Sequence, residues 1–228
     1  MIRQTFAIAV VFALCGCEAD PYADQARRVL GDVELELSAA GVSTLVVEQG
    51  EGTLTVAGGA DASEIRASVS LASAWEDESG DEDAMAAARV SLEDEGDGVA
   101  RLVARFSREQ YGYGLPTVVE VPRELLVDAT DGSGELIIDT VTAVALRDGS
   151  GDASITNIAT DVTVEDGSGD LTVDNVGGSV TVFDGSGDLV LRDVDGHATI
   201  TDGSGDIVLE DVQSWEVVED GSGDVVED

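Results

Sequence analysis

The stretch DGSGDLTVDNVGGSVTVF, residues 166–183, decides the fold because the second half of the chain repeats it. The first interval between copies is 17 residues and the next four are 18. A fixed period of this length is typical of a solenoid, in which each repeat forms one coil. The copies begin as DGSGE at Asp131 and as DGSGD at Asp148, Asp166, Asp184, Asp202 and Asp220.

Apolar residues recur at fixed positions counted from the first Asp of each copy, and most are two residues apart. This spacing predicts short strands with one buried face. One copy buries about five apolar side chains at roughly 1.5–3 kcal/mol each, which is less than the cost of ordering eighteen residues. Each coil must therefore lie on its neighbours. We expect an all-β, single-stranded β-solenoid of about 18-residue coils, with two or three strands per coil. The apolar columns are position 6 (Leu136, Ala153, Leu171, Leu189, Ile207, Val225), position 8 (Ile138, Ile155, Val173, Leu191, Leu209), position 11 (Val141, Ile158, Val176, Val194, Val212) and positions 15 and 17 (Val162, Val164, Val180, Val182, Ala198, Ile200).

The solenoid is expected to extend toward the N-terminus in less regular form. GEGTLTV at residues 50–56 lines up with GSGDLTV at residues 167–173. We therefore divide the chain into irregular β rungs at 31–125, interrupted by the acidic insertion EDESGDED at residues 76–83, and the regular solenoid at 126–228. In the fifth copy Glu216 falls in an inward column, which predicts either a bulge that turns Trp215 and Val217 inward or an opened coil.

The first residues resemble a targeting segment. An apolar run at residues 5–14 follows Arg3 and is too short for a spanning helix. It ends in Leu-Cys-Gly-Cys at residues 14–17, which resembles the lipobox of bacterial lipoproteins. We predict a signal peptide at 1–16, lipidation (palmitate) at Cys17, and an anchor and linker at 17–30. The alternative is a plain secretory signal with an incidental cysteine.

The repeat also resembles a known family. GSGD followed by an apolar-x-apolar strand, and the V-P-x-x-L step at Val121, Pro122 and Leu125, are similar to the DUF4097 group of bacterial envelope proteins. The resemblance covers roughly residues 40–228. It implies an adhesin-like β-solenoid on or under the cell envelope. Together with the lipobox, we expect a membrane-anchored protein, periplasmic or surface-exposed, at either the inner or the outer membrane. It implies no catalytic residues.

The acidic turns allow two interpretations. Calcium prefers six to eight oxygens, and adjacent turns could supply carboxylates and carbonyls. Alternatively, Gly permits a tight corner while Asp and Ser side chains accept backbone hydrogen bonds, with the charges solvated along an exposed edge. We favour the second interpretation and keep calcium as the possible cofactor. The candidate ligands are Asp131, Glu135, Asp148, Asp152, Asp166, Asp170, Asp184, Asp188, Asp202, Asp206, Asp220 and Asp224. Position 10 (Thr140, Asn157, Asn175, Asp193, Asp211) forms a second polar column, expected to close the other corner through side-chain-to-backbone bonds.

Composition narrows the function. The formal charge of −37 repels phosphate, so we expect no nucleic-acid partner. Carboxylates repeated evenly look structural, which disfavours a polysaccharide-active β-helix enzyme. The candidate partner-binding residues are the aromatic side chains of Tyr111, Tyr113 and Trp75, since aromatics can stack on sugars or contact a protein. We expect a non-enzymatic, lipid-anchored scaffold or adhesin-like protein whose partners are the membrane and envelope proteins or surface glycans; calcium binding by the stacked turns is the alternative.

Overall fold

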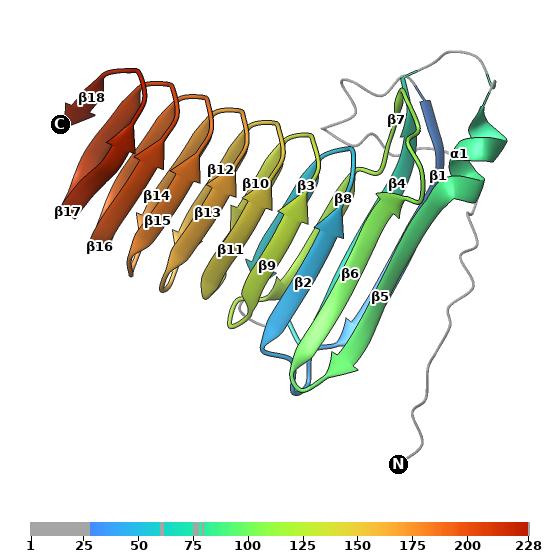
Figure 1. The fold of residues 1–228 in the computed structure, drawn as a ribbon. Coiled ribbons are helices and arrows are strands. Elements are labelled where there is room, and N and C mark those ends of the chain that lie inside the picture. Colours follow the sequence, from blue (N-terminus) through green and yellow to red (C-terminus); the bar gives the residue numbers. More distant parts are fainter. Residues whose placement is uncertain (1–27, 60–61, 75–77, 79, 228) are drawn as a thin grey trace.

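The computed structural model describes residues 28–59, 62–74, 78 and 80–227. Within these residues the chain is almost entirely β, with a single short helix, and the strands stack into an elongated body (Figure 1). This confirms the predicted all-β solenoid.

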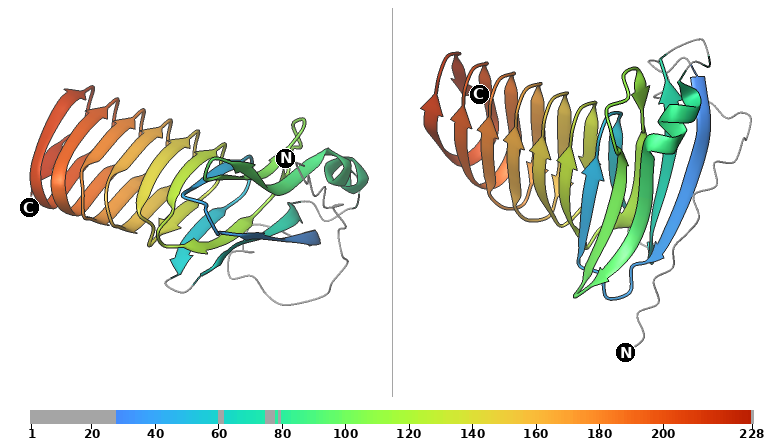
Figure 2. Two further views of the ribbon diagram at one scale, coloured as in Figure 1. Left: turned by 90° about the horizontal axis from the view of Figure 1, so that it is seen from below. Right: turned by 45° about the vertical axis from the view of Figure 1, so that its right-hand side comes forward.

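Each regular coil contributes extended chain to two faces, and the acidic turn joins one coil to the next. Up to β15 the two faces are separate strands, whereas β16 and β17 each run continuously across both. Strands of successive coils pair in parallel, with a register of 17 residues at the first step (Asp148 opposite Asp131) and 18 at the next (Asp166 opposite Asp148). The two faces of stacked strands can be followed in Figure 2. The strands are β9 (Leu126–Asp131), β10 (Leu136–Asp139), β11 (Ala143–Asp148), β12 (Ala153–Ile158), β13 (Val162–Asp166), β14 (Leu171–Val176), β15 (Val180–Asp184), β16 (Leu189–Asp202), β17 (Ile207–Asp220) and β18 (Val225–Glu227).

The predicted apolar columns form the core. All members of positions 8, 15 and 17 are buried, as are those of positions 6 and 11 except Val225 and Val212 in the last coils. The last coil also settles the register near Trp215. The pairing with β16 shortens to 17 residues over Ser214–Val217 and returns to 18 at Glu219. This bulge places Trp215 opposite Ala198, so the bulge was the correct alternative.

The first coil comes from much earlier in the chain, as the GEGTLTV alignment predicted. Strands β2 (Thr44–Gln49) and β3 (Leu54–Gly59) pair in parallel with β9 and β10, and Leu54 lies opposite Leu136. On their other side they pair with β6 (Val99–Phe106) and β8 (Thr117–Pro122). The sheet is thus continuous across the predicted boundary at 125/126.

The rest of the N-terminal half differs from the irregular rungs that we expected, because its outer strands are antiparallel. On one face β1 (Arg28–Ser38) pairs with β4 (Glu64–Ser73), and β4 also pairs with β7 (Tyr113–Gly114) and β8. On the other face β5 (Ala88–Gly96) pairs with β6. Helix α1 (Asp81–Ala87) lies at this end, which we call the capped end (Figures 1 and 2). Asp81 joins the parts of this end: it accepts hydrogen bonds from Arg28 Nη1 at 2.7 Å and from Tyr113 Oη at 3.1 Å.

Candidate functional site

Glycine allows the acidic turns to stack closely. The fourth residue of each copy has φ between +131° and +153°, a region that disfavours side chains. A Cβ added at Gly187 would also lie 2.5 Å from the carbonyl carbon of Gly169 in the coil before it. Backbone bonds connect the turns, as from Gly187 N to Ser204 O at 3.0 Å. Gly at these positions is therefore required by coil-to-coil contact as well as by the turn.

The two acidic positions of the turn face opposite sides, which corrects the expectation of a single exposed edge. The first position points into the core corner, and its five members retain only 2–6% exposure; we call Asp131, Asp148, Asp166, Asp184 and Asp202 the inner ladder. The fifth position is exposed; we call Glu135, Asp152, Asp170, Asp188, Asp206 and Asp224 the outer ladder. Asp220, in the last coil, is also exposed. The physical reason is strand parity, because the first Asp comes two residues after the last inward apolar residue and so faces inward as well.

The inner ladder is incompletely hydrogen-bonded. Asp184 Oδ1 accepts from Ser186 N at 3.1 Å, and Asp202 Oδ1 from Ser204 N at 3.2 Å, which is the turn chemistry that we expected for these aspartates. The Oδ2 atom of all five members is buried without a hydrogen-bond partner. A row of buried acceptors thus follows the inside of the acidic corner.

Burial changes the acidity of these groups. Loss of solvent, followed by repulsion from Asp148, raises the pKa of Asp131 to about 8. Burial and the neighbouring aspartates raise the pKa of Asp166 and of Asp184 to about 6. Burial likewise raises the pKa of Asp148 and Asp202. All five carboxyls therefore hold a proton more tightly than an exposed Asp.

The outer ladder bonds to the next coil. Asp152 Oδ1 accepts from Asp170 N at 3.1 Å, and Asp170, Asp188 and Asp206 each accept from the backbone N–H of the following member at 3.0 Å. These carboxylates keep contact with water while they tie coil to coil. In the described part of the chain, no three His, Cys, Asp or Glu side chains converge closely enough to hold a metal ion. The predicted calcium ligands are thus divided between the two sides of the turn.

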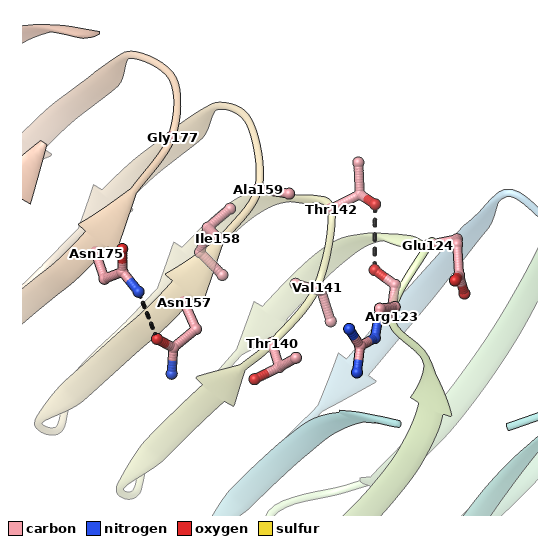
Figure 3. A pocket seen from close by; sticks show the side chains of 10 residues that line it. All are labelled: Arg123, Glu124, Thr140, Val141, Thr142, Asn157, Ile158, Ala159, Asn175 and Gly177. Carbon is pink, nitrogen blue, oxygen red and sulfur yellow. Dashed lines mark hydrogen bonds between the residues drawn. The ribbon is translucent and has the colours of Figure 1, made fainter. Parts of the chain in front are cut away.

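The opposite corner carries the position-10 column, whose members all have φ between +47° and +57°. The bonds here join side chains to one another, which differs from the side-chain-to-backbone bonds that we expected. Asn175 Nδ2 donates to Asn157 Oδ1 at 2.7 Å (Figure 3). Asn157 Nδ2 in turn donates to Asp139 Oδ1 at 2.7 Å. Burial would raise the pKa of Asp139, but hydrogen bonds from Asn157, Thr156 and Thr140 outweigh it and lower that pKa. Stacked amides and left-handed backbone thus replace a conventional turn.

A shallow hollow of about 390 Å³ lies along this corner. Its polar side is formed by the amides of Asn157 and Asn175, and its apolar side by Val141 and Ile158 (Figure 3). The hydroxyl of Thr142 donates to the Arg123 carbonyl at 3.1 Å. The sequence reasoning missed this hollow, and the only signal for it was the polar position-10 column.

The two tyrosines expected to contact a partner differ in burial. Tyr111 is 81% exposed, and its hydroxyl donates to Glu109 at 3.0 Å. Tyr113 is 8% exposed and fixes the capped end through Asp81, so it is not available to a partner. Trp75 and Cys17 lie outside the described residues. No helix among the residues that the structure describes is long and apolar enough to span a bilayer.

Comparison with known proteins identifies the repeat. Residues 115–226 match the family described as Toastrack DUF4097, while no curated protein matches the chain. Among solved structures, the chain is similar to a "putative adhesin" from Bacteroides fragilis (13% identity, 87% of this chain, 98% of that chain, TM-score 0.48). It is also similar to a "putative cell adhesion protein" from Clostridium sporogenes (11%, 88% and 100%, TM-score 0.45) and a "putative lipid binding protein" from Parabacteroides distasonis (12%, 86% and 96%, TM-score 0.47).

Proposed function

Because residues 115–226 belong to the Toastrack DUF4097 family, we propose that this chain is a non-enzymatic, lipid-anchored protein of the bacterial cell envelope. Its solenoid serves as a scaffold or adhesin-like module. The partners are the membrane, through the lipid, and envelope proteins or surface glycans.

The observation that carries this proposal is the repetition of one surface along the solenoid. Coils in 18-residue register present the same outward positions again and again, from β13 to the first half of β17. An extended repeated face suits contact with an extended partner. A catalytic pair would have to differ from the other copies, but the acidic residues follow the repeat, five of them buried in the inner ladder.

The fold also supports anchoring at one end. Arg28, eleven residues after Cys17, bonds to Asp81 of α1 at the capped end. A lipid at Cys17 would therefore hold the capped end within about 40 Å of the bilayer surface, given roughly 3.5 Å per extended residue. The regular coils would then be free to extend away from the membrane.

Lipidation is tested by exchanging each of the two cysteines, Cys15 and Cys17, in turn. In a bacterium that matures lipoproteins, cells are labelled with a clickable palmitate analogue and separated into membrane and soluble fractions. We expect label and membrane retention for the wild type and for Cys15→Ser, and loss of both for Cys17→Ser. Label that persists in Cys17→Ser, or an unlabelled wild type, would contradict the anchor.

The adhesin-like role needs a separate measurement. Cells that display the wild-type protein are compared with cells expressing Cys17→Ser for retention on surfaces coated with bacterial envelope glycans or envelope proteins. Greater retention of the displaying cells supports the proposal, and exchange of the exposed Tyr111 for Ser tests whether its loop contributes. Equal retention would remove the adhesin-like role.

A further inference from the structure

We propose that the inner ladder takes up shared protons between neutral and mildly acidic pH, the O–H of one rung donating to the carboxyl of the next, so that the solenoid becomes more stable as pH falls. The proton is the ligand of this site, and the row of buried Oδ2 atoms is what binds it.

The surroundings of the ladder leave little else to compensate its charge. Asp148 and Asp184 face Asp166 from β11 and β15, while Asp170 and Asp188 of the outer ladder add negative charge near Asp184 and Asp202. Asp220 adds a further negative charge beside Asp202. Among the described residues, no ion pair involves an inner-ladder member. The inward side chains of the facing strands β12 and β14 are aliphatic.

Stacking places the O–H of a protonated ladder carboxyl next to an acceptor oxygen of the carboxyl in the neighbouring coil. Parallel register places consecutive members directly over one another, about 4.8 Å apart along the solenoid. At the start of the ladder burial, followed by repulsion from Asp148, raises the pKa of Asp131, as expected where stacked carboxyls compete for protons.

The first coil ends the ladder with a neutral residue. Register places Gln49 in the column before Asp131, and Gln49 is buried. Its Nε2 donates to the Leu115 carbonyl at 2.7 Å, and its Oε1 accepts from Thr117 Oγ1 at 2.9 Å. The column therefore contains an uncharged amide where both polar side-chain atoms have partners and carboxyls where Oδ2 has none, which is the pattern expected if the carboxyls supply their own protons.

The direction of the pH effect follows from linkage. A carboxyl whose pKa is higher in the folded state stabilises the fold fully below the unfolded pKa of 3.8. That contribution is lost as pH rises to about 6 for Asp166 and Asp184, and to about 8 for Asp131. The ladder should therefore destabilise the solenoid progressively from pH 4 to pH 8.

The test compares two substitutions in one turn that remove the same charge. Asp166→Asn replaces an inner carboxylate with an amide that can donate to its neighbour, whereas Asp170→Asn changes the outer ladder and keeps an oxygen for Asp188 N. Thermal unfolding of the otherwise complete chain is followed by circular dichroism at pH 5 and pH 8. We expect Asp166→Asn to raise the unfolding midpoint at pH 8 and to raise it much less at pH 5. The factor by which the substitution changes the unfolding constant should be about tenfold larger at pH 8 than at pH 5. Asp170→Asn should give a small shift that is similar at both pH values.

Two results of the unfolding experiment would overturn the proposal. One is an equal response of Asp166→Asn and Asp170→Asn at pH 8. The other is a calcium effect at pH 8, in which millimolar CaCl₂ raises the midpoint of the wild type but not that of Asp166→Asn, and NaCl of equal ionic strength raises neither. The ladder would then hold a metal ion. Infrared spectroscopy provides a readout that does not depend on stability. At pH 7 the wild type should show the carbonyl band of a protonated carboxyl, and Asp131→Asn should lose intensity there. Absence of the band from a folded wild type would also refute the proposal.

Discussion

Replacing Gly187 with Ala tests whether coil spacing depends on glycine. The substitution adds a methyl group where φ is +142°, at a cost of about 1–3 kcal/mol for a sparsely populated backbone region. The same methyl group lies 2.5 Å from the carbonyl carbon of Gly169, and the overpacking adds about 1–3 kcal/mol. Because that contact is to backbone, no side-chain rotation relieves it. We expect a total loss of about 4 kcal/mol, a large share of the roughly 5–15 kcal/mol typical of a domain.

The matched control is Gly41→Ala, since Gly41 also has positive φ, at +84°, but has open space where its Cβ would be. It should lose only the backbone contribution, about 1–2 kcal/mol. Urea denaturation followed by circular dichroism gives both values from the midpoints, provided that the slopes agree. If Gly187→Ala unfolds at the same urea concentration as Gly41→Ala, close contact between turns does not set the spacing of the coils.

Three further predictions use the same denaturation assay or its thermal equivalent. Leu171→Ala, at a fully buried position, should lose about 2–5 kcal/mol of unfolding free energy, while Thr163→Ala on the exposed side should change it by less than about 0.5 kcal/mol. Similar losses for the two variants would contradict the assigned faces. Asn175→Ala should lose about 1–2 kcal/mol of unfolding free energy, because the bond to Asn157 is missing and φ is +56°. Asn175→Gly should recover part of this loss, and an Ala variant as stable as the Gly variant would refute the role of φ. Melting curves in CaCl₂, MgCl₂ and NaCl of matched ionic strength should coincide at pH 7, and a rise specific to calcium would revive the predicted calcium site.

Much of the solenoid could be predicted because the repeat places chemically similar residues in register. Five apolar columns identified the buried face, and the single misfit at Glu216 located the bulge. The alignment of residues 50–56 also identified a coil whose neighbour, β10, lies about eighty residues away in sequence. Stacking against an identical coil is a strong constraint, so the sequence pattern was sufficient there.

The antiparallel end could not be predicted, because it has no repeat. Strands β1, β4 and β5 alternate in polarity as the rungs do, and alternation gives a strand's buried face but not its direction or its neighbour. The first coil, β2 and β3, also lies between strands that come later in the chain, β6 and β8 on one side and β9 and β10 on the other. Pairing between such distant segments depends on tertiary packing.

The inner ladder, in contrast, had a signal that composition obscured. Val180 and Val182 face inward, and Asp184 continues the same spacing of two. Because Asp usually lies on the surface in a Gly-rich turn, residue type outweighed parity in the prediction. In other solenoids as well, polar residues that continue the two-residue spacing of an apolar column should be predicted to face inward.

The two aspartates of one turn show how strand geometry decides the electrostatics of this chain. Asp188 is exposed, and its Oδ1 accepts the N–H of Asp206 at 3.0 Å, so its charge is met by water and by a backbone dipole. Asp184, four residues earlier, is buried with an unpartnered Oδ2. Both carry the same charge when ionised, but only Asp184 must be neutralised to remain in the core without penalty. In a chain of net charge −37, exposed carboxylates such as Asp188 therefore cost the fold little. The loss of stability at high pH should begin along the inside of the acidic corner, where five carboxyls are stacked, and not on the more highly charged surface.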